Sequence, residues 1–341
     1  MRYPEFLRER GCIGFVAPSF GCVTEPYHAA FERAQQVLRS RGFRTLLGPN
    51  CYASDGVGKS STPENCGREI NEMYCSPETD ILISCGGGET MCEDLPYLDF
   101  ERLRAAKPKW FMGYSDNTNL TFLLTTLCDV ASVYGPNAPA FGMEPWHPAI
   151  TDALLLLTGQ KQIVSSYEGW ERQSRRDALH PYEPYYITEP SALHTYPMGQ
   201  AEFSGRLIGG CLDCLAGLVG TRFDRVAEFL ERYREDGFLW FLEACDLNTM
   251  GIRRALWQLD QAGWFRYCRG FLIGRPWLYE DASMGLNHTE AVTGILGKYG
   301  VPIVLDADLG HLPPAMPLLC GSVAKGKVQG TSLHLSMELR S

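Results

Sequence analysis

The stretch KWFMGYSDNTNL, Lys109–Leu120, contains a short apolar run, then a glycine, and then a serine that precedes a helix-like segment. It predicts a buried strand that turns sharply into a helix. Ser115 at this corner has two interpretations. It is either an ordinary residue that caps the helix, or a nucleophile whose hydroxyl is exposed by the turn beside the N–H groups of a helix N-terminus. Because the second glycine of the familiar G-x-S-x-G motif is missing, the motif alone does not decide between them.

Strand-like and helix-like segments alternate on both sides of this corner. The expected strands are CIGFVAPS (12–19), FRTLLG (43–48), TDILISCGGG (79–88), PKWFMGYS (108–115) and ASVYGPNA (131–138). The helix-like segment 62–77 begins with Thr62 as a candidate N-cap and a proline at the first helical position. This alternation predicts an α/β fold with a doubly wound, mostly parallel sheet. Ligands bind such sheets at the carboxyl ends of the strands, where Ser19, the run 86–89 and Ser115 fall.

The second half of the chain has a different character. Residues 161–200 contain several aromatic residues and prolines without a clear period, which is typical of a connector or of a functional loop. Apolar β-like runs then recur at 237–246, 269–277 and 301–311. We therefore predict an N-terminal α/β domain over residues 1–160, an aromatic-rich linker over 161–200, and a smaller β-rich domain over 201–341.

The composition limits the class of protein. The chain has 341 residues, of which 45% are hydrophobic and 21% are charged, as in a globular protein with a sizeable core. Its net charge of -9 argues against nucleic acid as a partner, because a polyanion requires a basic face. No apolar run is long enough to span a membrane and no signal-peptide pattern is visible, so we expect a cytoplasmic protein without a membrane partner.

Two motifs that suggest metal or nucleotide binding are incomplete. The single C-x-x-C, Cys211–Cys214, has no second ligand pair of the kind that a zinc site requires, so we expect it to pack a helix rather than to bind metal. The run ASDGVGKSS, 53–61, resembles the end of a phosphate-binding loop. Ala53 stands where that loop requires a glycine, and the helix is expected to begin only after Thr62.

A nucleophilic serine requires a base for its proton, and the base usually requires a carboxylate that orients it. Among the seven histidines, His311 alone follows a strongly apolar run, although a histidine in such a place is often structural. Glu243 closes the apolar run 237–243 and is the preferred carboxylate, because burial of a charge is costly without a partner. Asp306 and Asp308 are alternatives for the same role.

The glycines 86–88 suggest an oxyanion hole at the end of the third strand. Glycine allows the backbone to approach a ligand closely. The N–H groups of this run, together with the N–H of Asp116, would then stabilise a developing oxyanion. A tight turn between a strand and a helix is the structural alternative for the same glycines.

Eight short motifs occur together in a fixed order along nearly the whole chain. They are GFVAPS, GGGET, GYSDNTNL, VYGPN, GRLIGG followed by LAGLVGT, FLEACD, LIGR and DADLGH. In this order they resemble the LD-carboxypeptidase family of serine peptidases, which also contains the microcin C immunity proteins. The resemblance implies an N-terminal α/β domain, a smaller C-terminal β-rich domain, often a homodimer, and no metal or organic cofactor.

The resemblance also implies roles for particular residues. It assigns a catalytic triad to Ser115, His311 and Glu243, and an oxyanion hole to the backbone amides of Gly88 and Asp116. The residues expected to contact substrate are Gly87, Glu89, Trp170, Arg206 and Arg275.

Three of these substrate residues have specific expected roles. Trp170 is matched to an aromatic side chain that stacks on a nucleobase in the immunity branch of the family. Arg206 or Arg275 would bind a substrate carboxylate, because a guanidinium matches a carboxylate with two hydrogen bonds. A structural role is the alternative for each arginine.

The chain departs from the family at two places. Cys211 stands where family members often have asparagine, and the segment 160–200 is longer than a compact LD-carboxypeptidase requires.

The resemblance leaves two substrates open. One substrate is the L,D bond to the terminal D-alanine of a murein tetrapeptide, and the other is the amide of a peptidyl- or aminoacyl-nucleotide. An esterase, or a binding protein that has lost the chemistry, is the alternative function.

Overall fold

The structure of the protein is a computed structural model that describes residues 1–56, 58–199 and 201–340. The last residue of the predicted linker, the last residue of the predicted C-terminal domain, and Val57 in the run 53–61 lie outside the described residues. The chain divides into two compact units. The N-terminal unit comprises 1–161 and 173–186, and the C-terminal unit comprises 162–172 and 187–340.

The N-terminal unit contains, among the described residues, five parallel strands in the order β2-β1-β3-β4-β5. Their bounds are β1 (Cys12–Val16), β2 (Arg44–Leu47), β3 (Ile81–Ser84), β4 (Phe111–Gly113) and β5 (Ser132–Tyr134). Each strand lies within one of the five predicted runs, so the predicted α/β class with a parallel sheet is confirmed. The strand order changes direction between β1 and β3, and ligands bind doubly wound sheets at such a switch point.

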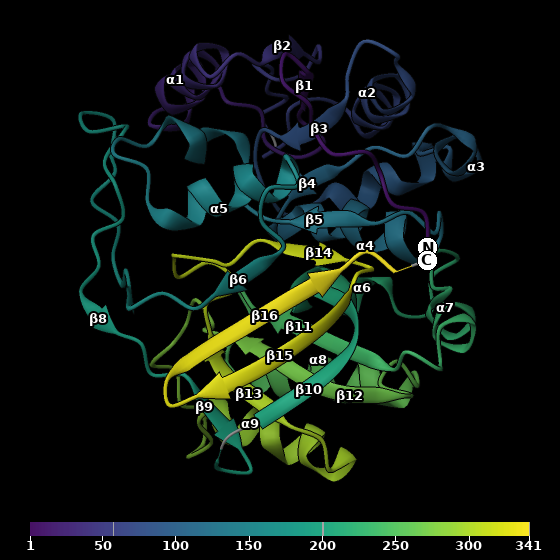
Figure 1. The fold of residues 1–341 in the computed structure, drawn as a ribbon, viewed down its shortest axis with the longest axis vertical. Helices are drawn as coiled ribbons and strands as arrows, with labels where there is room; N and C mark the ends of the chain where they lie inside the picture. The colour runs from purple at the N-terminus through teal and green to yellow at the C-terminus, as the bar shows by residue number, and fades with distance from the viewer. Residues whose placement is uncertain (57, 200, 341) are drawn as a thin grey trace. The chain divides into compact units, whose positions relative to one another are not determined.

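Helices connect these strands (Figure 1). They are α1 (Tyr27–Ser40), α2 (Pro63–Cys75), α3 (Phe100–Ala105), α4 (Thr118–Thr126) and α5 (Pro148–Leu157), with 3-10 helices η1 (Met91–Tyr97), η2 (Ser115–Asn117) and η3 (Ala138–Gly142). Helix α2 begins where the sequence predicts, because the Thr62 hydroxyl accepts a hydrogen bond from the Asn65 N–H at 3.3 Å and Pro63 occupies the first helical position. Helix α4 is buried on all sides, as its continuous apolar and threonine composition requires.

The C-terminal unit is built on a mixed sheet in the order β6-β16-β15-β10-β11-β12-β13-β9, in which β10 to β13 are parallel and the flanking pairs are antiparallel. The strands are β6 (Ile163–Ser165), β9 (His194–Tyr196), β10 (Ala201–Cys211), β11 (Phe238–Glu243), β12 (Cys268–Gly274), β13 (Ile303–Ala307), β15 (Val323–Gln329) and β16 (Ser332–Glu338). Figure 1 shows the long strands β15 and β16 in yellow beside β10. This sheet confirms the predicted β-rich second domain.

Short elements complete the C-terminal unit. They are β7 (Gly169–Trp170), β8 (Glu189–Pro190), β14 (Leu318–Cys320), α6 (Leu212–Leu218), α7 (Val226–Arg232), α8 (Thr249–Gln261), α9 (His288–Leu296) and η4 (Gly297–Tyr299). The core over β11 is aromatic, since the Trp240 ring stacks at 6.0 Å on Trp264 and meets Phe265 edge-on at 5.4 Å. Helix α9 begins with a complete capping box between Asn287 and Glu290.

The aromatic segment that the sequence sets apart is divided between the two units rather than forming one connector. Residues 173–186 pack on the N-terminal unit, where the Tyr182 carbonyl accepts a hydrogen bond from the Glu144 N–H at 2.8 Å. The Arg33 guanidinium lies 4.9 Å from the Tyr182 ring centre, and the ring of His147 lies 5.3 Å from that of Tyr185. Aromatic and cation–π contacts therefore hold this part of the segment.

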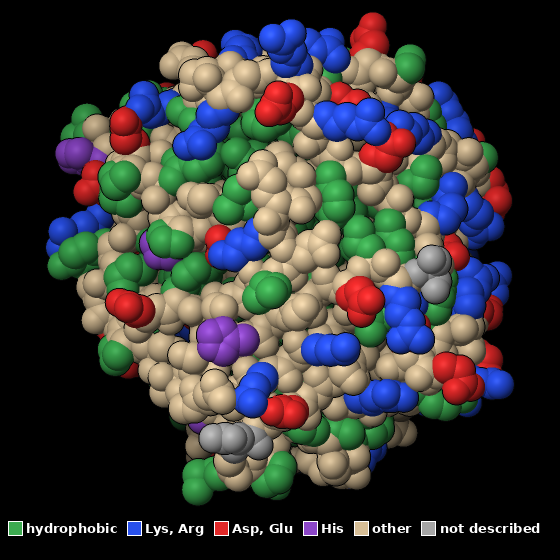
Figure 2. All heavy atoms as spheres, in the orientation of Figure 1, with side chains coloured by type: hydrophobic (Ala, Val, Ile, Leu, Met, Phe, Trp, Pro, Cys, Tyr) green, Lys and Arg blue, Asp and Glu red, His purple; other side chains and the backbone are tan. Residues whose placement is uncertain are grey.

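Figure 2 shows both acidic and basic side chains on this face of the molecule, with apolar side chains between them. Among the described residues, no helix has both the length and the apolar character that are needed to cross a bilayer.

We expect Thr62→Ala to lower the free energy of unfolding by about 1 kcal/mol, because the substitution removes the side-chain cap of α2. Urea denaturation followed by circular dichroism measures the change. Thr331→Ala is the control, since Thr331 is exposed in the turn between β15 and β16. Equal stability of the two variants would show that the cap does not contribute.

Candidate active site

Ser115 lies at the corner between β4 and α4 in a left-handed backbone conformation, with φ +65°. A capping serine has extended backbone and accepts a hydrogen bond from the helix. Ser115 is instead the first residue of η2, and Tyr114 occupies the capping position without a side-chain cap. A left-handed non-glycine residue at a sharp strand-to-helix turn is the geometry of a nucleophile elbow. Ser115 is therefore not the cap of the helix, and its role as a nucleophile stays a prediction.

Two side chains that the sequence analysis missed hold this corner. The Ser115 N–H donates to the Tyr134 hydroxyl at 3.1 Å, from the end of β5. The Asn117 amide donates to the Gly86 carbonyl at 2.8 Å and to the Tyr114 carbonyl at 3.1 Å. Both residues stand in the quoted motifs GYSDNTNL and VYGPN. Their role was not visible because it depends on which strand ends are neighbours.

The glycine loop after β3 lies directly beside the serine. A Cβ atom at Gly87 would lie 3.1 Å from Ser115 Oγ, and a Cβ atom at Gly88 would overlap Ser19 Oγ. Gly88 has φ +156°, and its N–H has no hydrogen-bond acceptor within the parts of the chain that the structure describes. The loop therefore brings unshielded backbone next to the hydroxyl, while the side chain of Glu89 is exposed beyond it.

Asp116, the residue after the serine, is 3% exposed. Its carboxylate accepts hydrogen bonds from the Ser19 hydroxyl at 2.6 Å, from the Met91 N–H at 2.9 Å and from the Asn119 amide at 3.1 Å. Burial raises the pKa of this carboxyl, and the three hydrogen bonds oppose that shift. The strand ends of β1, β3 and β4 are thus tied together at one carboxylate.

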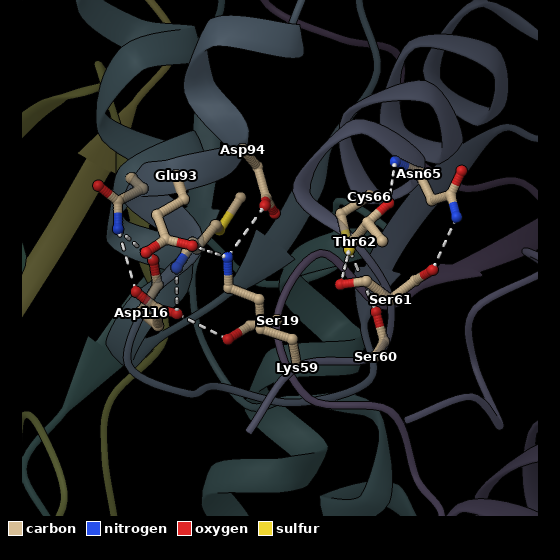
Figure 3. A network of polar contacts seen from close by, with 12 residues as sticks. Ser19, Lys59, Ser60, Ser61, Thr62, Asn65, Cys66, Glu93, Asp94 and Asp116 are labelled. Atoms are coloured by element: carbon tan, nitrogen blue, oxygen red, sulfur yellow. Dashed lines mark hydrogen bonds and ion pairs between the residues drawn. The ribbon is translucent and has the colours of Figure 1, made fainter. Parts of the chain in front are cut away.

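A second group of polar side chains, Lys59, Glu93 and Asp94, lies near Ser19 and Asp116 (Figure 3). The buried Lys59 ammonium lies 2.6 Å from the Glu93 carboxylate and 3.8 Å from that of Asp94. Asp94 is 1% exposed, and burial raises its pKa to about 8. Lys59 is engaged by these carboxylates, and α2 begins four residues after it, at Pro63, whereas a phosphate loop requires its helix to open at the lysine.

In the C-terminal unit, His311 and Glu243 are in direct contact. His311 Nδ1 lies 2.8 Å from Glu243 Oε2, and the Glu243 side chain is fully buried at the end of β11. His311 follows β13, so the contact passes over the end of β12. A Cβ atom at Gly274 would lie 2.9 Å from Glu243 Cβ, and one at Gly310, which has φ +93°, would lie 2.6 Å from Glu243 Oε2. Both glycines are therefore required by this close approach.

The two rival carboxylates have other partners. Asp308 pairs with Arg275 at 2.7 Å and accepts a hydrogen bond from the Tyr167 N–H at 2.7 Å. Asp306 lies 3.6 Å from His194 Nδ1 and 3.4 Å from the Tyr279 hydroxyl. Of the three candidates, Glu243 is the carboxylate that contacts His311 Nδ1 and can orient its ring.

The C-x-x-C segment orders the loop beside this pair. The Asp213 carboxylate accepts hydrogen bonds from the N–H groups of Cys245 at 3.0 Å, Asp246 at 2.9 Å and Leu247 at 3.1 Å. The Cys211 thiol donates to the same carboxylate at 3.2 Å. The described residues include no group of three or more His, Cys, Asp or Glu side chains arranged to hold a metal ion.

The expected substrate contacts of Trp170, Arg206 and Arg275 are not supported. Trp170 is 3% exposed and packs against Tyr279 at 5.1 Å and Arg275 at 5.3 Å, so its burial corrects the expectation that it stacks on a nucleobase. Arg206 is buried and paired with Asp236, and Arg275 is buried and paired with Asp308. Both arginines have the structural role that the sequence left open as the alternative.

A doubly wound unit with a serine at a strand-to-helix corner, followed by a unit in which a buried carboxylate contacts a histidine, agrees with one known family. The LD-carboxypeptidase N-terminal domain matches residues 13–135, and the LD-carboxypeptidase C-terminal domain matches residues 204–325. The chain belongs to this family of peptidases.

The chain is similar to relatives of two kinds. It is 26% identical over 323 residues to the microcin C7 self-immunity protein MccF of Escherichia coli, with 91% of this chain and 88% of the relative covered. It is 24% identical over 253 residues to the murein tetrapeptide carboxypeptidase of Pseudomonas aeruginosa, with 73% and 71% covered.

Solved structures confirm the fold over the whole chain. An MccF-like protein from Bacillus anthracis matches with a TM-score of 0.84 at 22% identity and covers 100% of both chains. MccF in complex with aspartyl sulfamoyl adenosine matches with a TM-score of 0.81 at 23% identity and covers 99% of both chains.

We expect the buried Asp94 carboxyl to make stability depend on pH. Its pKa is about 8 in the folded protein and about 4 in the unfolded chain, so folding is favoured at low pH and stability falls as the pH rises from 4 to 8. Asp94→Asn, which stays neutral, should reduce that fall by up to about 1.4 kcal/mol per pH unit.

Urea unfolding of both proteins at pH 5, 7 and 9 measures this dependence. Glu93→Gln is compared in parallel: the Glu93 charge contributes a smaller part of the rise in the Asp94 pKa than burial does, so this variant should reduce the slope less than Asp94→Asn. Identical slopes for the wild type and Asp94→Asn would show that Asp94 does not titrate in this range.

Proposed function

We propose that the protein is a serine-type peptidase whose triad is Ser115, His311 and Glu243, with an oxyanion hole from the N–H groups of Gly88 and Asp116. The observation that carries this proposal is the left-handed backbone of Ser115 at a strand-to-helix corner. A strained conformation of this kind persists only where its surroundings impose it, and it presents a hydroxyl for attack. The contact between His311 and Glu243 gives independent support.

The reaction follows from the atoms that are already engaged. Because His311 Nδ1 faces Glu243, Nε2 is the nitrogen that takes the Ser115 proton while Oγ attacks the carbonyl carbon. The carbonyl oxygen becomes an oxyanion and receives hydrogen bonds from the Gly88 and Asp116 N–H groups. His311 then gives the proton to the leaving amine, the C–N bond breaks, and an acyl-enzyme forms. Water, deprotonated by the same nitrogen, releases the acid and regenerates Ser115.

The substrate in this proposal is an amide bond next to a free carboxylate. Two relatives suggest two such substrates, a murein tetrapeptide and a peptidyl- or aminoacyl-nucleotide. Similarity to the microcin immunity protein covers more of the chain, at slightly higher identity, than similarity to the murein enzyme. We therefore favour the aminoacyl-nucleotide amide, and its base must be recognised by residues other than the buried Trp170.

The nucleophile is tested with a serine-directed fluorophosphonate. We expect the wild type to take one label and Ser115→Ala to take none, because the probe forms its bond with the activated hydroxyl. Ser132→Ala, which removes a buried hydroxyl from β5, is the matched control and should label like the wild type. Full labelling of Ser115→Ala would exclude Ser115 as the nucleophile, and an unlabelled wild type would favour a binding protein.

The substrate class is tested by hydrolysis of three compounds followed by mass spectrometry. These are aspartyl sulfamoyl adenosine, a murein tetrapeptide with terminal D-alanine, and a p-nitrophenyl ester. We expect the highest kcat/KM for the sulfamoyl adenosine and no hydrolysis of it by Ser115→Ala. Preference for the tetrapeptide would select cell-wall recycling, and hydrolysis of the ester alone would select an esterase.

A further inference from the structure

We propose that the Asp116 carboxylate and the Ser19 hydroxyl are positioning residues that hold the two oxyanion donors in place. This inference rests on the proposed function, because it concerns how the same site works. The two N–H groups belong to separate segments, the Gly88 loop after β3 and the Ser115 corner after β4. An oxyanion hole requires both donors within about 3 Å of one oxygen, so a contact between the two segments must fix their separation.

The Asp116 side chain makes that contact. Asp116 contributes one oxyanion donor through its backbone N–H. Its side-chain Oδ2 atom accepts hydrogen bonds from the Met91 N–H at 2.9 Å and from the Ser19 hydroxyl at 2.6 Å. Met91 begins η1, three residues after Gly88. The Oδ1 atom of Asp116 accepts a hydrogen bond from the side-chain amide of Asn119, in α4, at 3.1 Å. One carboxylate thereby anchors the downstream end of the glycine loop to the base of α4.

The Ser19 segment fixes the other side of the loop. The Phe20 N–H donates to the Gly87 carbonyl at 2.9 Å, and Ser19 Oγ lies so close to Gly88 that a Cβ atom there would overlap it. In a trans peptide the carbonyl and the following N–H point in opposite directions. The bond from Phe20 to the Gly87 carbonyl therefore turns the Gly88 N–H away from the Ser19 segment. This accounts for a Gly88 N–H without an acceptor among the residues described.

Burial makes these contacts strong. Ser19 is 0% exposed and Asp116 is 3% exposed, so water does not replace a lost partner and an unsatisfied group is costly. The Ser19 segment is itself held, because the Ser60 N–H donates to the Ser19 carbonyl at 2.7 Å and Glu69 accepts the Ala17 N–H at 2.9 Å. Figure 3 shows Ser19 and Asp116 joined, with Lys59 and Ser60 nearby.

The role predicted for Ser19 is specific to the transition state. Loss of its hydroxyl leaves Ser115, His311 and Glu243 unchanged but loosens the Gly88 and Asp116 donors, which act only when the oxyanion forms. One oxyanion donor is worth about 10²–10³ in rate, and a displacement of about 1 Å can cost about 10². Loss of the Ser19 hydroxyl should therefore lower the rate of acylation and leave the affinity for the substrate unchanged.

The test compares Ser19→Ala with the wild type in the kinetics of fluorophosphonate labelling. We expect the maximal rate of labelling to fall about 10- to 100-fold with an unchanged half-saturating concentration of probe. Hydrogen exchange at the Met91 amide should become faster, while exchange in β3 and β4 should not change. Ser132→Ala is the control for loss of a buried serine hydroxyl and should match the wild type in all three measurements.

Three results would overturn the inference, and one of them also removes the proposed function. An unchanged labelling rate in Ser19→Ala refutes the positioning role alone. A loss of rate accompanied by an equal rise in the half-saturating concentration, or by faster exchange throughout the sheet, shows a merely structural role. A wild type without label at Ser115 removes both proposals. Ser19→Cys, with a weaker donor of similar size, should give an intermediate rate and serves if Ser19→Ala does not fold.

Discussion

The left-handed backbone of Ser115 is the constraint around which the polar groups at the strand ends of the N-terminal unit are arranged. A non-glycine residue in this conformation costs of order 1–3 kcal/mol, and it persists only where neighbouring groups hold it. Here the hydroxyl of Tyr134 accepts the Ser115 N–H, and the side chains of Asn117 and Asp116 bind the adjoining segments. The corner is thus kept by polar side chains from the ends of several strands.

Both units build their polar sites in the same way. Parallel strands end at a common edge, and short loops from neighbouring strands then bring distant parts of the chain into contact. In the N-terminal unit these loops follow β1, β3 and β4, where Ser19, the glycine loop and Ser115 lie. In the C-terminal unit they follow β11 and β13. There the Glu243 side chain contacts His311, and Gly274 at the end of β12 leaves room for this contact because it has no side chain. Small residues at the edge allow these approaches.

Local patterns predicted much of this arrangement. The five strands of the N-terminal sheet, the Thr62 cap and the contact between Glu243 and His311 agree with the structure, because each depends on short-range spacing or on where a strand ends. The predictions for the aromatic segment and for Arg206 and Arg275 do not agree with the structure. Residues 161–199 belong to both units, and Arg206 and Arg275 are buried against aspartates that lie far away in the sequence. A sequence motif does not record whether a guanidinium faces solvent or an internal carboxylate.

The sequence by itself determined the α/β class, the position of the serine between a strand and a helix, and the family to which the motifs belong. The first two follow from hydrophobic periods and from residue types at strand ends, which are local properties, and the third from the resemblance of the ordered motifs to a known family. Only the tertiary structure decided that Ser115 is strained and not a cap, that Asp116 joins three strand ends, and that Trp170 is buried. Those outcomes depend on strand order and on contacts between segments far apart in the chain, and no local period encodes them.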